Sequence, residues 1–281
     1  MTSPSRFSRR HRVVAGDPPG AAELLAKVTG LSKGVVKDAM RKGAVWVSRS
    51  GRSPNRSRRE TATVKVGDVV EIHYDPELLA LRPPEARLVR DAVRWSAWAK
   101  PAGLLSQGTE FGDHASLLRQ VEKALDREVF LVHRLDREVE GLVLVAHDAA
   151  AAAALSALLR EAKVVKRYRA EVIGDVAARR GGDGVIDEPV EGKAARTTFR
   201  VVARDPERDT TTLEVTIETG RHHQIRRHLD AIGHPVLGDP RYGAGNKNRE
   251  GIRLAAVFLA FRDPFSGEGV ELRLPESPSV P

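Results

Sequence analysis

From Arg94 onwards, short runs rich in Val, Leu and Thr alternate irregularly with helical runs, and this pattern limits the possible folds more than any other feature of the sequence. The strand-like runs are Arg94–Ala99, Val129–Val132, Leu142–Ala146, Arg167–Ile173, Thr197–Val202 and Thr211–Thr219. The helical runs are Ala115–Leu125, Ala149–Ala162 and His223–Ile232. Because the runs lack the repeated strand–helix–strand order of parallel sheets, they predict an α+β fold with a mixed, mainly antiparallel sheet.

A smaller unit precedes this region. Ala21–Val28 is expected to form a short amphipathic helix, and Ser32 is a suitable N-cap for a second helix over Lys33–Lys42, which Gly43 ends. Strand-like segments follow, so this part predicts a small α/β domain. The expected division is a basic tail over residues 1–20, the small domain over 21–75, a proline-interrupted linker over 76–93 and the large domain over 94–281.

Positive charge is concentrated near the N-terminus. Residues 1–60 hold 14 Lys and Arg against 4 Asp and Glu, whereas the whole chain has a net charge of +8. In the second helix Lys33, Lys37 and Arg41 recur at four-residue steps, away from an apolar face. A local basic excess attracts polyanions through counterion release, so the charge favours a nucleic acid partner over a merely solubilising tail.

Several classes of protein are disfavoured by composition. The chain has no cysteine, which excludes disulfides, thiolate zinc sites and a cysteine nucleophile. No run approaches the roughly 20 apolar residues of a membrane span, and the N-terminus lacks the apolar core of a secretory signal. We therefore expect a cytoplasmic protein that does not enter a membrane, with a monomer as the default state.

A polar loop with His133, Arg134 and Asp136 separates two apolar runs in Leu131–Ala146. An Arg–Asp pair at a strand end is usually structural, so the loop by itself does not establish catalysis. A kinase is excluded because the order differs from His-Arg-Asp with a downstream Asn, and no Gly-rich phosphate loop precedes it. The histidines near the C-terminal helical run lack the i, i+4 spacing of a metal site, so we expect no metal; they are His222, His223 and His228.

Motifs in sequence order resemble those of RluA-type pseudouridine synthases. They are Lys100-Pro101-Ala102-Gly103-Leu104, His133-Arg134-Leu135-Asp136 with Gly141-Leu142, Arg167-Tyr168-Arg169-Ala170, Thr219-Gly220-Arg221-His222-His223-Gln224-Ile225-Arg226 with His228, and Gly233-His234-Pro235-Val236-Leu237-Gly238-Asp239 with Tyr242-Gly243. The resemblance spans residues 100–243. It implies an enzyme that detaches uracil from ribose at a ring nitrogen and re-attaches it through carbon 5, with no metal or organic cofactor.

The resemblance also implies roles for single residues. Asp136 corresponds to the catalytic aspartate, acting as a nucleophile or as a base that removes a sugar proton; the sequence leaves both open. Arg226 corresponds to its basic partner, and Tyr168 to the ring that stacks on the target base. Access to the bond requires base flipping. His133, Arg134 and Arg221 are expected to contact RNA, which in this family is ribosomal or transfer RNA.

The N-terminal unit resembles the S-four-type RNA-binding domain over residues 31–47 and 66–70. In that domain the helix that here carries Ser32, Lys33, Lys37 and Arg41 lies against the RNA backbone. The domain's usual short turn is replaced here by an Arg-rich loop over residues 48–59, which either extends the RNA contact or is disordered.

The chain departs from the RluA-type pattern immediately after the aspartate. Val139 and Glu140 stand where the family has Thr and Ser, whose hydroxyls are expected to brace the loop. Glu140 could turn towards Asp136 or face outwards and pair with an arginine. Two alternatives therefore stay open: a non-catalytic RNA-binding or ribosome-assembly protein, and a glycoside hydrolase or nucleosidase that pairs Asp136 with Glu138 or Glu140.

Overall fold

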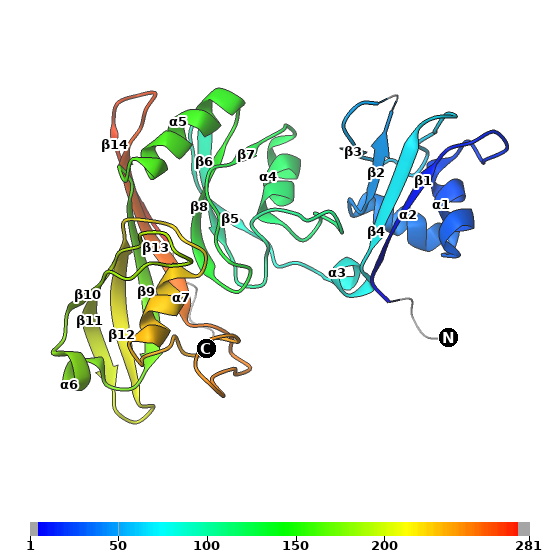
Figure 1. The fold of residues 1–281 in the computed structure, drawn as a ribbon. Helices are drawn as coiled ribbons and strands as arrows, with labels where there is room; N and C mark the ends of the chain where they lie inside the picture. The colour runs from blue at the N-terminus through cyan, green and yellow to red at the C-terminus, as the bar shows by residue number, and fades with distance from the viewer. Residues whose placement is uncertain (1–4, 50, 275–281) are drawn as a thin grey trace. The chain divides into compact units, whose positions relative to one another are not determined.

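The chain forms two compact units in a computed structural model that describes residues 5–49 and 51–274 (Figure 1). The first unit comprises Met1–Pro83 and Gln107–Leu125, and the second comprises Pro84–Ser106 and Asp126–Pro281. The segment Gln107–Leu125 thus packs with the first unit, although the sequence pattern grouped it with the large domain. No helix within the described residues is long and apolar enough to cross a membrane.

The first unit is a four-stranded antiparallel sheet in the order β1-β4-β2-β3, packed against helices. Its elements are β1 (Phe7–Arg12), α1 (Ala21–Thr29), α2 (Lys33–Arg41), β2 (Val45–Ser48), β3 (Asn55–Arg56), β4 (Val69–Tyr74), α3 (Pro76–Ala80) and α4 (Leu117–Leu125). Apolar residues of α1, α2, β2 and β4 form one buried core. Ser32 caps α2 as expected, since its side chain accepts a hydrogen bond from the Val35 N–H at 3.3 Å.

Two stretches expected to lack regular structure contain it. Within the expected basic tail, β1 pairs along its whole length with β4, from Phe7 opposite Tyr74 to Arg12 opposite Val69. Its side chains are mostly polar, so the run carries little of the apolar signal that identifies a strand. Within the expected linker, Asp75 caps the short helix α3, and Arg87–Asp91 forms strand β5.

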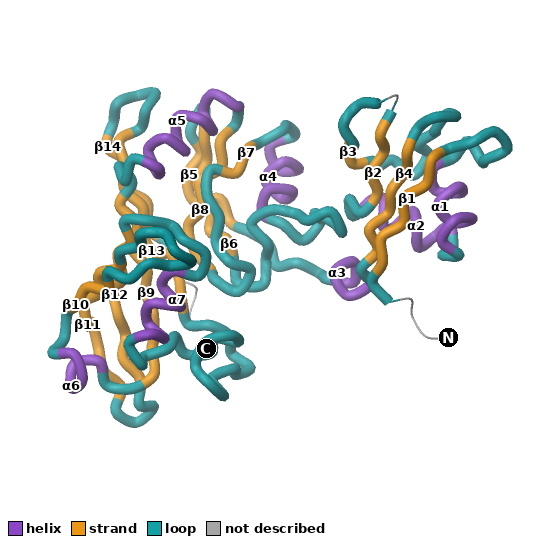
Figure 2. Tube along the Cα trace, viewed as in Figure 1, coloured by secondary structure: helices purple, strands orange, loops and turns teal. Residues whose placement is uncertain are grey.

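The second unit contains a ten-stranded sheet in the order β10-β11-β12-β9-β13-β8-β6-β5, with β14 on β13 and β7 on β8 (Figure 2). Its strands are β5 (Arg87–Asp91), β6 (Trp95–Lys100), β7 (Phe130–Leu131), β8 (Glu140–Ala146), β9 (Val165–Ile173), β10 (Gly184–Ile186), β11 (Thr197–Asp205), β12 (Thr210–Ile217), β13 (Leu254–Arg262) and β14 (Gly269–Arg273). Only the β13–β8 pair is parallel among the described strands. The predicted α+β class with a mainly antiparallel mixed sheet is confirmed.

Strand β13 holds the two halves of this sheet together, although we did not predict it from the sequence. It pairs antiparallel with β9, placing Ala256 opposite Tyr168, and parallel with β8, placing Ala256 opposite Gly141. At Gly141 φ is 135°, and a Cβ there would lie 2.5 Å from the Ala256 backbone, so only glycine permits this approach. The loop before β8 and the side chains of β9 are thereby brought to one place.

Within its described residues the second unit has three helices: α5 (Ala149–Arg160), α6 (Val176–Arg180) and α7 (Gln224–Ala231). Helix α5 packs on β8 over a core that includes Trp95, Leu142 and Leu144. Helix α7 is fastened to the start of β11, because Gln224 Nε2 donates to Arg196 O at 2.9 Å and His228 Nδ1 lies 2.9 Å from Thr197 Oγ1. This attachment fixes the first turn of α7.

Candidate active site

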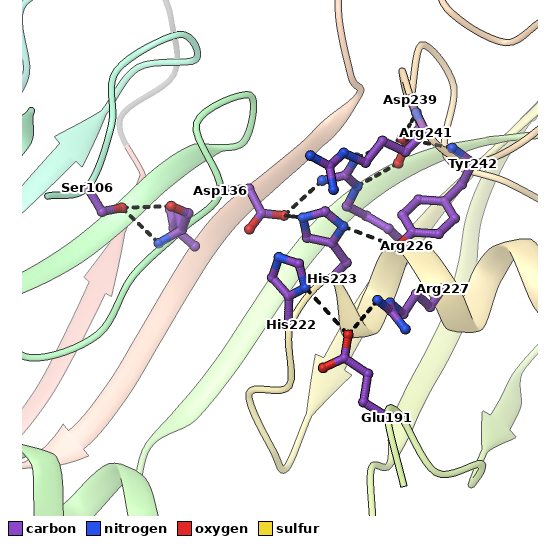
Figure 3. A network of polar contacts seen from close by, with 11 residues as sticks. Ser106, Asp136, Glu191, His222, His223, Arg226, Arg227, Asp239, Arg241 and Tyr242 are labelled. Atoms are coloured by element: carbon purple, nitrogen blue, oxygen red, sulfur yellow. Dashed lines mark hydrogen bonds and ion pairs between the residues drawn. The ribbon is translucent and has the colours of Figure 1, made fainter. Parts of the chain in front are cut away.

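A pocket in the second unit contains Asp136, from the loop before β8, together with side chains of β9 and α7. Its lining consists of Arg134, Leu135, Asp136, Val139, Tyr168, Ile217, Gly220, Arg221, His223, Gln224, Ile225, Arg226 and Leu254. The Asp136 side chain is 20% exposed. Its Oδ2 accepts a hydrogen bond from Arg226 Nη1 at 2.9 Å, whereas Oδ1 has no polar partner among the described residues (Figure 3). One carboxylate oxygen is therefore held by Arg226, and the other is not bonded to a protein group in the described part of the chain.

The loop that carries Asp136 is braced on both sides by the segment after β6. Ser106 Oγ donates to Leu135 O at 2.7 Å and accepts from Leu135 N–H at 3.0 Å (Figure 3). On the other side, Gly103 N–H donates to Arg137 O at 2.7 Å. The buried Lys100 ammonium donates to Leu104 O at 2.8 Å and to Arg137 O at 3.3 Å, and burial lowers its pKa to about 8. The backbone next to Asp136 is therefore fixed without help from a Thr-Ser pair.

Arg226 lies between two carboxylates. Its side chain is only 2% exposed, its Nε and Nη2 donate to Asp239 at 2.6 and 2.7 Å, and its Nη1 donates to Asp136. Burial alone would lower the pKa of Arg226, but the hydrogen bonds and charges of Asp239 and Asp136 raise it overall. Asp239 also accepts from the backbone N–H groups of Arg241 and Tyr242. The guanidinium is thus permanently charged and aimed at Asp136.

His223 adds a third contact to the aspartate. It is the N-cap of α7 with φ at 55°, a left-handed conformation uncommon outside glycine that tends to occur at functional sites. Its Nε2 lies 3.4 Å from Asp136 Oδ2, and its Nδ1 lies 3.1 Å from the Tyr242 hydroxyl (Figure 3). Burial lowers the pKa of His223, although the negative charge of Asp136 acts to raise it.

Tyr168 reaches the same pocket from the centre of β9. The register places it opposite Val215 of β12 and Ala256 of β13, so its backbone is paired on both sides and the ring projects from an interior strand rather than from an edge. Burial, and secondarily the charge of Asp136, raise the pKa of its hydroxyl. The hydroxyl therefore stays protonated at neutral pH, and the ring provides a flat surface beside Asp136.

The two residues that depart from the family pattern point in opposite directions. Val139 is buried and lines the pocket, whereas Glu140 is exposed and lines a separate groove with Arg167 and Arg169. Of the two orientations considered for Glu140, the structure has the outward one. Asp136 is the only carboxylate among the residues that line the pocket, so the paired carboxylates of a glycoside hydrolase are not found there.

The residues expected to contact RNA in the second unit occupy different places. Arg134 and Arg221 line the pocket, and their contact with RNA stays a prediction. His133 does not; its Nε2 accepts the Leu144 backbone N–H at 3.1 Å. Burial, and then the charge of Lys166, lower the pKa of His133 to about 4, so the neutral ring acts as part of the β8 scaffold.

The basic stripe of α2 is present in the first unit, but acidic side chains accompany it. Lys33 lies 3.6 Å from Glu23 and Lys37 lies 3.3 Å from Glu60, and Arg41 donates to Glu60. The Ser32 hydroxyl is engaged in the N-cap of the same helix. These exposed pairs are weak and screened by salt, so the cations stay available to another anion.

The Arg-rich loop that follows β2 is ordered where the structure describes it. Arg56 donates to Gly43 O and, at 2.5 Å, to Thr109 O, and Arg58 donates to Asp113. Both arginines therefore fasten the segment around residues 109–113 within the first unit. Residue 50 of this loop lies outside the described residues.

Sequence reasoning assigned no role to three of the residues around Asp136: Ser106, His223 and Asp239. The last two stood within quoted motifs, and that was the available signal; nothing marked Ser106. The sequence expectation of no metal was based on spacing, yet ligand atoms of Asp136, His222 and His223 lie within 4.8 Å of one another. The Arg226 guanidinium already occupies Asp136 Oδ2, so a metal ion would have to compete with it for that oxygen. The third histidine, His228, is bonded to Thr197 Oγ1 and Glu188 O instead.

Comparisons with known proteins identify relatives of this chain. A family model described as RNA pseudouridylate synthase matches residues 94–231. An uncharacterized RNA pseudouridine synthase of Chloroflexus aurantiacus is 32% identical, over 94% of this chain and 90% of the relative. Ribosomal large subunit pseudouridine synthase C of Haemophilus ducreyi is 30% identical, over 78% of this chain and 74% of the relative.

Solved structures share the fold. Human RNA Pseudouridylate Synthase Domain Containing 1 superposes with a TM-score of 0.57 at 23% identity, over 70% of this chain and 86% of that chain. Human RNA Pseudouridylate Synthase Domain Containing 4 gives a TM-score of 0.55 at 21% identity, over 69% of this chain and 89% of that chain. The sheet described above is therefore the pseudouridine synthase fold.

Proposed function

We propose that this chain, which belongs to the RluA-type RNA pseudouridine synthases, isomerises specific uridines of structured ribosomal or transfer RNA with Asp136 as its catalytic residue. The observation that carries the proposal is the asymmetry of the Asp136 carboxylate in the pocket: Arg226 holds Oδ2 at 2.9 Å, whereas Oδ1 has no polar partner among the described residues. An arginine beside a carboxylate favours the ionised form, and the free oxygen is then a nucleophile or a base.

The proposed reaction rearranges bonds within the substrate and needs no second reactant. The bond from the ribose carbon 1 to the uracil ring nitrogen breaks, a bond from the same ribose carbon to ring carbon 5 forms, and the proton on carbon 5 leaves as the nitrogen gains one. No electrons are gained or lost overall, so we propose that neither a metal nor an organic cofactor takes part. Asp136 acts as a nucleophile or as the base that removes a sugar proton, and both roles need the ionised carboxylate.

Tyr168 is proposed to stack on the target base. Its ring lines the pocket beside Asp136, and base–aromatic stacking is worth about 1–3 kcal/mol. Because burial raises the pKa of its hydroxyl, the group is a donor at neutral pH and not a ready base. The target nucleotide must leave the stack to reach this ring, and Arg134 and Arg221 at the same pocket supply charge for its phosphates.

The first unit is proposed to supply RNA affinity as an S-four-type domain built on residues 21–75, and the second unit to supply catalysis. The basic helix α2 supports the RNA-binding role, since Lys33, Lys37 and Arg41 line one exposed side of it. Strand β1 also belongs to the sheet of the first unit, so the working unit begins before residue 21. Strand β5, within the expected linker, belongs to the second unit's sheet, and Gln107–Leu125 packs with the first unit. We propose that the enzyme acts as a cytoplasmic monomer.

The experiment that tests this function is pseudouridine mapping of total RNA from cells with and without the gene. We expect one or a few uridines to lose modification in the deletion strain and to regain it on complementation. Complementation with the Asp136→Asn variant should leave the sites unmodified. An unchanged map in the deletion strain would contradict the proposal and favour a non-catalytic RNA-binding role.

A further inference from the structure

A tight hairpin between β10 and β11 carries an acidic residue at its tip. We call residues 187–196 the Glu191 hairpin. Val190 and Lys193 exchange backbone hydrogen bonds of 2.9 and 3.1 Å, and Glu191 and Gly192 between them have φ of 53° and 73°. Two consecutive left-handed residues define a turn in which Asn, Asp or Gly is favoured at the first position. A glutamate is therefore held there against its backbone preference.

The Glu191 carboxylate lies on a pair of basic side chains next to the pocket. Its Oε1 accepts from Arg227 Nη2 at 2.7 Å and lies 3.8 Å from His222 Nδ1 (Figure 3). Arg221 Nε also donates to the hairpin, at Ala194 O, at 3.1 Å. The Nε of Arg227 is buried and has no hydrogen-bond partner among the described residues, although buried polar groups are nearly always paired.

This contact lies close to the reacting carboxylate. The His222 ring stacks on His223 with centroids 3.8 Å apart, and His223 Nε2 is 3.4 Å from Asp136 Oδ2. A nucleotide whose base enters the pocket must leave its phosphates near the pocket opening. His222 contacts the pocket-lining His223, and Arg227 shares the Glu191 carboxylate with His222, so both basic side chains are near neighbours of the pocket lining.

We propose that Arg227 and His222 form a subsite for a backbone phosphate of the RNA substrate, which Glu191 occupies in the free protein. The carboxylate bonds only one N–H of the Arg227 fork, whereas a phosphate with several acceptor oxygens can bond Nη2 and, once the side chain turns outwards, the Nε that is buried and unpartnered in the free protein. Binding then exchanges one anion for another, with no covalent step. The inference rests on the proposed function, because it takes the pocket to be the place where the nucleotide binds.

The test is a double-mutant cycle on RNA affinity in the full-length protein. The probe is a large-subunit ribosomal RNA transcript made in vitro, which carries no modification, and dissociation constants are measured over a range of salt concentrations. Glu191→Gln should tighten binding by about two- to fivefold, since no carboxylate has to be displaced. Arg227→Gln should weaken binding and make the slope of log affinity against log salt shallower by about 1.

The cycle separates a subsite from a general charge effect. In the Arg227→Gln background, Glu191→Gln should have a much smaller effect, because the Arg227 cation that it releases is gone and only His222 remains. Glu188→Gln removes one negative charge from the same hairpin. The Glu188 side chain has no polar partner among the described residues, so this change should alter affinity much less than Glu191→Gln. Equal effects of the Glu188→Gln and Glu191→Gln substitutions, or a Glu191→Gln effect that is undiminished without Arg227, would overturn the proposal.

Two further measurements keep the result interpretable. Glu191→Asn also removes the charge but suits the left-handed turn, so it should reproduce the tighter binding with an unchanged or higher midpoint of thermal unfolding; weaker binding by both variants would also overturn the proposal. Pseudouridine formation is followed in parallel. A wild-type protein that makes no pseudouridine either in this transcript or in unmodified transfer RNA contradicts the proposed function, whereas the binding cycle alone tests the subsite.

Discussion

Two arginine–carboxylate networks in this molecule combine the same side chains in opposite surroundings. In the second unit, Arg226 is 2% exposed and lies between Asp136 and Asp239. In the first unit, Arg41 is 54% exposed and lies between Asp38 and Glu60. A buried charge depends on its partners, whereas an exposed pair is easily replaced by water, salt or another anion. We therefore infer that the Arg226 network holds the geometry of the pocket, whereas the Arg41 network provides positive charge that another anion can take over.

The buried network should be the more sensitive to loss of a partner. Asp239→Asn leaves the Arg226 guanidinium short of one counter-charge, and such losses cost about 3–5 kcal/mol of unfolding free energy. Urea unfolding at neutral pH measures the change. Glu60→Gln is the matched control and should leave the unfolding midpoint nearly unaltered. Similar losses from both substitutions would break the comparison.

His133 should make stability depend on pH. Burial, with Lys166, lowers its pKa in the folded protein from 6.5 to about 4. As the pH falls below 6.5, His133 becomes protonated in the unfolded chain but not in the folded protein. The contribution of this residue to the free energy of unfolding is therefore fully present above pH 6.5 and is lost towards pH 4. The loss amounts to at most about 3 kcal/mol.

His133→Gln sharpens this point, because Gln does not titrate and can still accept the Leu144 N–H. Urea unfolding between pH 4 and 7 should show a flatter pH dependence than in the wild type. RNA affinity at pH 7 should stay the same. A large loss of affinity would instead support His133 as an RNA contact.

Ser106 should affect catalysis through the loop that it holds. Ser106→Ala leaves the N–H and C=O of Leu135 unpaired, which costs about 1–3 kcal/mol. We expect kcat to fall by a larger factor than KM rises, since Leu135 adjoins Asp136 directly, whereas Arg221 and helix α2, which lie outside this loop, are left in place to bind the RNA. Ser116→Ala is the control: that buried hydroxyl also bonds a backbone C=O and N–H, at Asp113 and Arg119 of the first unit. An equal loss of kcat in both variants would mean a general loss of folding.

The exposed network should give the smallest effect, and only on binding. Glu60→Gln releases Lys37 and Arg41, so RNA affinity should rise by about two- to fivefold at low salt and the difference should fade as salt increases. Lys37→Gln should weaken binding by a similar factor. Filter binding with one ribosomal RNA transcript measures both. If neither substitution changes RNA affinity, helix α2 does not contact the RNA.

Much of this arrangement could be predicted from the sequence, because local patterns and motif order carry it. The helices α1, α2, α5 and α7 and the strands β8, β9 and β12 lie within a few residues of their predicted positions. Asp136, Tyr168 and Arg226 came from the ordered motifs, and the structure brings all three to one pocket. Their roles remain predictions, as do the domain boundaries.

What could not be predicted depends on contacts between distant residues. The brace from Ser106 to Leu135 spans 29 positions and has no local signature. Strand β13 joins the two halves of the sheet through its parallel pairing at Gly141, and the spacing of apolar residues along the sequence cannot reveal which strands pair. The acids beside α2 lie on other elements, so a helical stripe of Lys33, Lys37 and Arg41 could not show that Glu23 and Glu60 accompany it.

The most direct test of the account is single-turnover pseudouridine formation by the purified Asp136→Asn variant at saturating RNA. Asn keeps the size of the side chain and removes the charge that Arg226 holds, so we predict no detectable product, with RNA affinity within about twofold of the wild type. Glu140→Gln, at a carboxylate that lies outside the pocket, should turn over normally. Product formation by Asp136→Asn at the wild-type rate would contradict the account.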